Sequence, residues 1–394
     1  MASPFVFHRT ELANTIVAGL AGKGLADYSS GLFLAAPRRT GKSTFLREDL
    51  VPACSAAGWL TVYVDLWSNM QADPGQLIEA AIVRALQQFD NQIKKLLKSA
   101  GVDKINVMRT VSWDLTRGSL PEGATLADAL QLLHVASGQM VVLVVDEAQH
   151  ALNSESGVNA MFALKAARDA LNLGASTPGL RLIFTGSSRD KLAQLVLNRQ
   201  QPFFGASITP FPLLGDDFVD AYTEDVNTKL APGNNFHPDD MKRAFRLVGH
   251  RPEQLAAIVE RVALQLGSAP DLGKLLEEGA EAVQAGVWNE YEAAYYPLTP
   301  SQKAVLEVMA LCSAKGTPFT AFSEATVNRV NAIAQSLGAD SATTAQTIQA
   351  ALEALRDKGL VWKSGRGAYA LEDSGMADWV KKLHEGRDGT DAAV

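Results

Sequence analysis

The sequence predicts an α/β protein, in which a parallel sheet flanked by helices is followed by helical segments and a C-terminal hairpin. Short apolar runs at 32–35, 60–66, 140–146 and 180–184 are separated by stretches with helical periodicity. Runs of this length that are rich in β-branched residues predict buried strands, and their alternation with helices predicts a parallel sheet. Polar or acidic side chains follow three of the runs, at the sheet edge where ligands approach an open parallel sheet.

Local spacing justifies each further element. Leu12, Ile16, Val17 and Leu20 recur on one face of a helix. The same spacing predicts helices over 74–99, 126–136, 239–248, 253–266, 270–294, 300–311 and 344–358. Residues 104–113 alternate instead, which predicts an edge strand or a hairpin, and the glycine-bracketed stretch 359–371 predicts a two-strand hairpin.

A tight turn follows the first predicted strand and leads into a helix. Its residues are Ala36, Pro37, Arg38, Arg39, Thr40, Gly41, Lys42, Ser43 and Thr44. Backbone N–H groups of such a turn, together with the N-terminus of the next helix, form a site for phosphate groups. We expect Lys42 to reach the outer phosphates and the Ser43 hydroxyl to bind Mg²⁺. Ala36 occupies the first glycine position of the pattern G-x-x-x-x-G-K-[ST], so some backbone strain is expected there. Residues 37–44 are the predicted nucleotide-binding loop.

Two acids end the third apolar run. Asp146 and Glu147 follow six consecutive apolar residues, and a strand buried on both faces has no structural need for paired carboxylates. Beside a phosphate-binding loop, the first acid is expected to hold the Mg²⁺ shell and the second to polarise the attacking water. A helix-cap role for Asp146 is the alternative. Thr185 and Ser187 end the next strand and are expected to orient the water or sense the γ-phosphate, or else to form a simple turn.

Several cations are candidates for contact with a nucleotide. Arg189 and Arg199 lie beyond the strand at 180–184, and either could act across a subunit boundary as an arginine finger or be solvated. Arg251 lies in the junction Gly-His-Arg-Pro and could reach a phosphate, the alternative being a helix start at Pro252. Near the start of the chain, His8 and Arg9 could cover the adenine edge of the nucleotide, or belong to a capped helix packed on the sheet.

Composition narrows the class of protein. The 394 residues are too many for one ordinary core, and 36 Lys+Arg against 43 Asp+Glu give a net charge of −7, which argues against bulk electrostatic coating of nucleic acid. Cys54 and Cys312 have no metal-ligand neighbours, so a zinc site or a disulfide framework is not expected. No secretion signal and no apolar run of membrane-spanning length are visible, and a cytoplasmic location is therefore expected.

The C-terminal part has the pattern of a separate module. Tyr295-Tyr296-Pro297 resembles a linker, and the following helices and hairpin predict a winged helix-turn-helix. From Leu298 to the end there are ten Lys/Arg and eleven Asp/Glu, 10 − 11 = −1, so there is no strong electrostatic footprint. Basic residues nevertheless gather at the helix end and hairpin, where DNA phosphates could be bound. They are Arg356, Lys358, Lys363 and Arg366. Docking of a protein partner or structural support is the alternative.

These motifs together resemble those of AAA+ ATPases, in the branch that includes archaeal-type ATPases, STAND NTPases and origin-recognition initiators. The matching residues are 7–12, 37–43, 145–147, 185–187 and 249–252, and the resemblance spans roughly 5–375. It implies a P-loop NTPase core over 1–212, a helical lid over 213–296 and a winged helix over 297–384. The polar residues 385–394 are expected to form a disordered tail. It also implies a homo-oligomeric ring or spiral that binds nucleotide between neighbours.

Two functions follow from this resemblance. The first is an ATPase that uses Mg²⁺ and couples ATP binding and hydrolysis to oligomerisation and to engagement of DNA or a protein partner. The second is a nucleotide-gated, STAND-like signalling switch with little turnover and no DNA binding. Turnover measured with and without DNA separates them.

Overall fold

The computed structural model describes residues 5–24, 26–69, 71–98, 119–175, 177–231, 233–263, 271–365 and 367–391. These residues form two compact units. The sheet unit comprises 8–36 and 42–211, and the helical unit comprises the described parts of 1–7, 37–41 and 212–394. The sequence predictions at 104–113 and at Arg366 lie outside the described residues.

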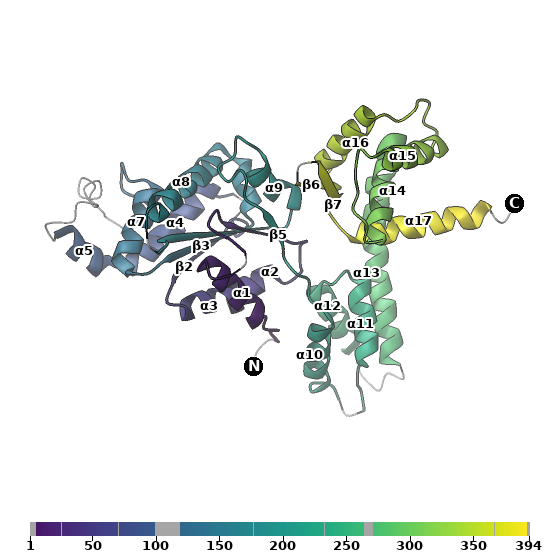
Figure 1. Cartoon of the computed structure of the whole chain (residues 1–394). Helices are drawn as coiled ribbons and strands as arrows, with labels where there is room; N and C mark the ends of the chain where they lie inside the picture. Colours follow the sequence, from purple (N-terminus) through teal and green to yellow (C-terminus); the bar gives the residue numbers. More distant parts are fainter. Residues whose placement is uncertain are drawn as a thin grey trace. The chain divides into compact units, whose positions relative to one another are not determined.

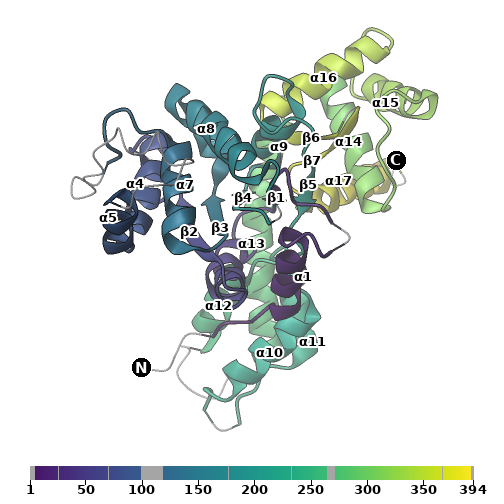
Figure 2. The ribbon, with the colours of Figure 1, turned by 60° about the vertical axis from the view of Figure 1, so that its left-hand side comes forward.

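The sheet unit is built on five parallel strands in the order β2-β3-β4-β1-β5, which Figure 2 shows side by side. Their bounds are β1 Leu32–Ala35, β2 Leu60–Asp65, β3 Val141–Asp146, β4 Leu180–Gly186 and β5 Ile208–Pro210. Every residue of β1, β3 and β4 is buried, because helices cover both faces. β4 lies between β1 and β3, so the strand that ends at Thr185 and Gly186 separates the loop strand from the strand that ends at Asp146.

Two helical layers enclose this sheet (Figure 1). One layer contains α4 Pro74–Gln87, α5 Asp90–Lys98, α7 Leu126–Ser137, the 3-10 turn η4 Ala148–Asn153, α8 Glu155–Asn172 and α9 Arg189–Leu197. The other contains α1 Thr10–Leu20, α2 Lys42–Phe45, the π-helical turn η1 Leu46–Leu50 and α3 Val51–Ala56. Alternate strand residues serve the two layers: Leu143 and Phe184 pack toward α7 and α8, while Val144 and Ile183 pack toward α1 and α3.

Polar caps set where the layer helices begin. Asp73 accepts a hydrogen bond from the Gln76 amide before the helix-starting Pro74, and Thr125 forms a capping box with Asp128. The helix predicted over 74–99 is interrupted, since α4 ends at Gln87 and α5 begins at Asp90. The break turns the chain so that Ile93 joins the core beside α7.

The helical unit contains two hydrophobic cores joined by one helix. Its elements are α10 Asp216–Asn227, α11 Pro238–Leu247, α12 Pro252–Ala263, α13 Leu272–Tyr295, α14 Pro300–Ala314, α15 Glu324–Ser336, α16 Ala345–Asp357, β6 Val361–Gly365, β7 Ala368–Leu371 and α17 Gly375–Asp391. Leu276 of α13 packs with α10, α11 and α12, whereas Tyr295, at its other end, packs with α14 and α17. Figure 1 shows α13 running from one group to the other. α13 contributes to both cores, so the predicted lid and winged-helix parts lie in one compact unit, and their separate domain bounds stay a prediction.

The last helix, α17, continues to Asp391, so residues 385–391 of the predicted tail are helical. A buried carboxylate anchors it. Glu307 of α14 has no exposed side-chain surface and accepts both Nη1 contacts of Arg387, at 3.0 and 3.1 Å, as well as the hydroxyl of Tyr295. His384 Nε2 lies 2.7 Å from the same carboxylate. Among the described helices, none has the length and apolar character to cross a membrane.

Candidate functional site

The acid pair lies where β3 leaves the sheet. Asp146 is the last residue of β3 and only 1% exposed. Glu147 adopts a left-handed backbone conformation with φ of 55°, before the turn η4. A non-glycine residue in this conformation is held there by its surroundings, which is common at functional sites. The turn directs the two carboxylates into different sets of contacts.

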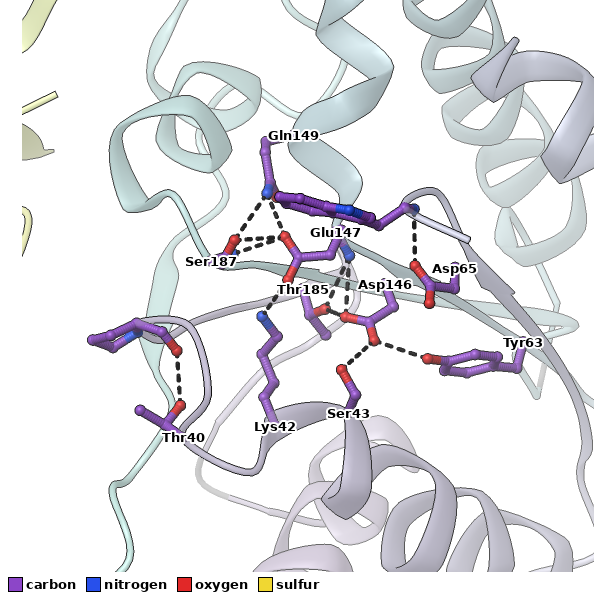
Figure 3. Close-up of polar contacts among 12 residues, drawn as sticks. Thr40, Lys42, Ser43, Tyr63, Asp65, Asp146, Glu147, Gln149, Thr185 and Ser187 are labelled. Atoms are coloured by element: carbon purple, nitrogen blue, oxygen red, sulfur yellow. Dashed lines mark hydrogen bonds and ion pairs between the residues drawn. The ribbon is translucent and has the colours of Figure 1, made fainter. Parts of the chain in front are cut away.

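Asp146 accepts hydrogen bonds from three hydroxyl groups on three elements (Figure 3). Ser43 Oγ of α2 donates over 2.7 Å and Tyr63 Oη of β2 over 2.8 Å to the same carboxylate oxygen. Thr185 Oγ1 of β4 donates to the other oxygen, which also accepts the Glu147 amide at 3.1 Å. Burial and the adjacent Asp146 carboxylate raise the pKa of the Tyr63 phenol, so it remains a donor.

Glu147 is paired with the lysine of the predicted loop. Lys42 Nζ lies 3.1 Å from Glu147 Oε1, and the two side chains are 6% and 14% exposed. The other carboxylate oxygen accepts the Ser187 hydroxyl at 2.7 Å, the Ser187 amide at 3.2 Å and the Gln149 side-chain amide. Burial alone would raise the pKa of the Glu147 carboxyl, but the Lys42 charge and these hydrogen bonds outweigh it and lower the pKa. Glu147 is therefore ionised at neutral pH.

The predicted phosphate loop takes its unusual backbone at other positions than expected. Arg39 and Gly41 have φ of 65° and 84°, and Thr40 Oγ1 donates to the Pro37 carbonyl at 2.9 Å. Ala36 has no positive φ; it is buried, and its amide donates to the Gly186 carbonyl at 3.2 Å. The strain expected at Ala36 is therefore wrong, because Ala36 extends the contact between β1 and β4.

The residues around Asp146 suit a hard divalent cation. The Ser43 hydroxyl and the Asp146 carboxylate already meet at 2.7 Å, and both are oxygen ligands of the kind that Mg²⁺ prefers. Mg²⁺ usually takes one or two protein oxygens and completes its shell with phosphate and water. Within the described residues, no cluster of three or more His, Cys, Asp or Glu could hold a metal ion by itself.

The N-terminal candidates pack against the helix behind the loop. His8 Nδ1 lies 2.8 Å from Asp49 Oδ1, and the Arg9 amide donates to Asp49 Oδ2 at 3.1 Å. The Arg9 guanidinium lies over the Phe211 ring, 4.8 Å from its centroid. His8 and Arg9 are thus attached to the π-helical turn that follows the loop, and their contact with adenine stays a prediction.

The three remaining arginines lie on other elements than the loop and the acid pair. Arg199 is exposed in the turn after α9, and Arg189 is the first residue of that helix. Arg251 forms an ion pair of 2.9 Å with Asp373, in the turn between β7 and α17. The three arginine roles stay predictions.

The basic residues of the predicted DNA-binding set surround the end of α16. Arg356 is in its last turn, Lys358 follows it and is exposed, and Lys363 lies in β6. The exposed face of α16 is otherwise neutral or acidic, with Gln346, Ala350 and Glu353.

Sequence reasoning missed three residues of the site. Tyr63 is two positions before the end of β2, on the same face as Asp65, and the alternation of a strand could have placed it beside the acids. Gln149 follows Glu147 by two residues in η4, a turn that the sequence did not predict. Asp49 gave no signal, because the π-helical turn that buries it does not follow an α-helical period.

The fold has the architecture of a P-loop NTPase. Three features define this class of fold here: the loop, the acids at the end of a strand, and the strand order of the parallel sheet flanked by helices. Among solved structures, a Walker-type ATPase of Pyrococcus abyssi is similar, with a TM-score of 0.52, 15% identity and coverage of 95% of this chain and 96% of that one. The ORC2 protein of Aeropyrum pernix in its ADP form has a TM-score of 0.54 and 13% identity, with coverage of 98% and 96%. The same protein in ADPNP–ADP complexes has a TM-score of 0.51 and 13% identity, with coverage of 100% and 97%.

At these identities the likeness is one of fold, and it extends over nearly the whole chain. The resemblance stated from the motifs is confirmed at that level. No protein-family model matches the sequence. No curated protein matches it either.

Proposed function

We propose that this protein binds Mg²⁺ and ATP at the loop and acid pair, and that it hydrolyses the nucleotide. The observation that carries the proposal is that Lys42 pairs with Glu147 and Ser43 donates to Asp146, which connects the predicted loop to the two carboxylates at the end of β3. A buried lysine and a buried carboxylate are costly to retain unless they serve a ligand or each other. The nucleotide-bound states named for the Aeropyrum pernix protein of the same fold support this choice of ligand.

Each side chain has a defined task in this proposal. Lys42 binds the outer phosphates, and Ser43 and Asp146 hold the metal ion, which supplies neutralisation of phosphate charge. Thr185, completely buried, fixes the orientation of Asp146. Glu147 accepts a proton from the attacking water, and Ser187 and Gln149 keep its second oxygen in place.

The decisive experiment compares two variants of the acid and loop positions. Glu147→Gln should bind ATP and ADP with wild-type affinity but lose turnover by about 100-fold or more, the usual contribution of a general base. Lys42→Ala should lose binding. Glu155→Gln, an exposed glutamate at the start of α8, is the matched control. Normal turnover by Glu147→Gln would refute the assignment of the base.

A second function, a nucleotide-gated switch with little turnover, is favoured by one observation. Glu147 is held by Lys42, Ser187 and Gln149, so this state of the acid must lose a contact before it can serve a water. Single-turnover and steady-state measurements separate the two functions, because a switch hydrolyses one nucleotide slowly and an ATPase cycles.

We also propose that the C-terminal helices and hairpin engage a partner, DNA or protein, and that nucleotide drives assembly of a homo-oligomer. The basic residues near the end of α16 support contacts with phosphates rather than base reading by the exposed face of that helix, which is neutral or acidic. Lys358→Glu should weaken DNA retention and reduce its salt dependence. Lys274→Glu, an exposed lysine of α13, is the charge-matched control, and equal effects of the two would favour a protein partner.

The two buried, unpaired cysteines, Cys54 and Cys312, agree with a reducing, cytoplasmic setting.

A further inference from the structure

The Asp146 side chain accepts four hydrogen bonds, and all four donors belong to the sheet unit (Figure 3). One oxygen, Oδ1, accepts the Thr185 hydroxyl and, at 3.1 Å, the Glu147 amide. The other, Oδ2, accepts the Ser43 hydroxyl at 2.7 Å and the Tyr63 hydroxyl at 2.8 Å. An ionised carboxylate offers about four lone pairs to donors. Every acceptor position of this side chain is therefore occupied.

The four donors differ in what would happen to them when a cation arrives. The Glu147 amide belongs to the backbone of the turn after β3, and Thr185 is completely buried, so these two donors stay in place. The Ser43 hydroxyl has lone pairs for a metal ion and can keep its proton on the carboxylate. Tyr63 is the remaining donor, and it reaches the carboxylate from β2, the edge strand beside β3. The phenol thus decides whether Asp146 Oδ2 has a lone pair free for a cation.

The ring of Tyr63 is held so that its hydroxyl has little freedom to leave Asp146. The ring packs against the core between the sheet and the helices α1 and α3. The Arg47 guanidinium lies over the ring, 5.0 Å from its centroid. Arg47 Nη2 is also 3.8 Å from Asp65 Oδ2, two residues further along β2. The core contact and the stacked cation together restrict rotation of the ring.

A carboxylate without a free lone pair discriminates between divalent cations. Mg²⁺ dehydrates reluctantly and keeps several waters in protein sites, so hydroxyl groups and water can link it to an occupied carboxylate. Ca²⁺ takes about six to eight oxygen ligands in a flexible geometry, and carboxylates are its usual direct ligands. We propose that Tyr63 determines the metal specificity of the site, because its hydroxyl occupies the last acceptor position of Asp146 and so favours Mg²⁺ over Ca²⁺. This inference rests on the proposed function.

Removal of the phenol hydroxyl should relax this preference. Tyr63→Phe keeps the ring and its packing, and it leaves one lone pair of Asp146 open to a cation. The measurement is the affinity of the full-length protein for ADP, by calorimetry, once with Mg²⁺ and once with Ca²⁺. A contact with a charged oxygen usually changes affinity by about tenfold or more. The ratio of the affinity with Ca²⁺ to the affinity with Mg²⁺ should therefore rise about tenfold in Tyr63→Phe.

Three further variants make the test specific. Tyr222→Phe removes a hydroxyl from a half-buried ring of α10, in the helical unit, and should leave the ratio at the wild-type value. In an Asp146→Asn background, Tyr63→Phe should not change the ratio, because the charged oxygen that Ca²⁺ would reach is gone. If Tyr63→Phe does not fold, Tyr63→Met removes the same hydroxyl and should raise the ratio in the same direction.

An unchanged ratio in Tyr63→Phe overturns the inference, whether or not thermal stability falls, since the hydroxyl would then serve only to satisfy a buried oxygen. An equal rise in Tyr222→Phe, or an equal rise when Asp146 is already Asn, overturns it as well. Wild-type protein that binds ADP with neither metal would refute the proposed function itself, and this inference with it.

Discussion

Replacing Lys42 with methionine removes a buried charge and keeps the length of the side chain. At 3.1 Å and an effective dielectric constant of about 20, the attraction between Lys42 and Glu147 is about 5 kcal/mol before the cost of dehydration. Breaking a buried pair by removing one partner usually costs about 3–5 kcal/mol. Because Ser187 and Gln149 still donate to Glu147, we expect Lys42→Met to lower the free energy of unfolding by about 2–3 kcal/mol at pH 7.5.

The pH dependence gives this prediction its sign. In the folded wild type the pKa of Glu147 is lowered below its value in the unfolded chain, which is about 4.3. The contribution of Glu147 to stability is therefore complete above pH values of about 4.3. It is lost as the pH falls through the lower pKa of the folded state. Without Lys42, burial dominates and raises the pKa of Glu147, so the folded state then binds a proton that the unfolded state releases. The deficit of Lys42→Met should therefore shrink as the pH falls from 7.5 to 5.5.

Urea unfolding of nucleotide-free protein, followed by circular dichroism at both pH values, measures the deficit. Lys42→Met/Glu147→Gln is the control, because it leaves no unpaired carboxylate and should recover about 2 kcal/mol at pH 7.5. A deficit that is equal at both pH values, or a double variant no more stable than Lys42→Met, would refute the reasoning.

Three further predictions concern stability elsewhere. Ala36→Gly should lower the free energy of unfolding by up to about 1 kcal/mol and leave nucleotide affinity unchanged, since Ala36 has no positive φ; a tenfold gain in affinity by calorimetry would contradict this. Glu307→Gln should cost about 2 kcal/mol in thermal unfolding, less than a fully buried pair because Arg387 is 38% exposed, and it should be clearly less stable than the exposed control Glu385→Gln. Gly286→Ala should gain about 0.5–1 kcal/mol, because a Cβ there meets nothing within 4 Å, and a loss in urea unfolding would contradict it.

The sheet and the acid pair could be predicted because their signals are local. Six apolar residues before Asp146 predict a strand buried on both faces, and the loop before Lys42 carries its pattern within a few residues. What the acids contact could not be read from the sequence in the same way. The pairing of Glu147 with Lys42, across 105 positions, depends on β4 lying between β1 and β3.

Arg251 shows a second limit. Its position in Gly-His-Arg-Pro indicated a phosphate ligand, but its partner in this structure, Asp373, lies in a turn with no sequence pattern of its own. The tail at 385–394 was predicted from its polar composition, and composition does not reveal that Arg387 reaches the buried Glu307. Both contacts are ion pairs between distant segments, and the phosphate role of Arg251 stays a prediction.

The joining helix α13 has a mechanical consequence. Its 24 residues span about 36 Å, and its two ends are each fixed in a different core. A tilt of α13 by a few degrees at the end beside α11 would displace its far end by a few ångströms. The displacement would include α14 and the hairpin. Gly286 lies between the stretches that the two cores grip, where the helix is exposed and has least side-chain support. A loss of helical stiffness at Gly286 would therefore reduce how much of such a tilt reaches the far end of α13.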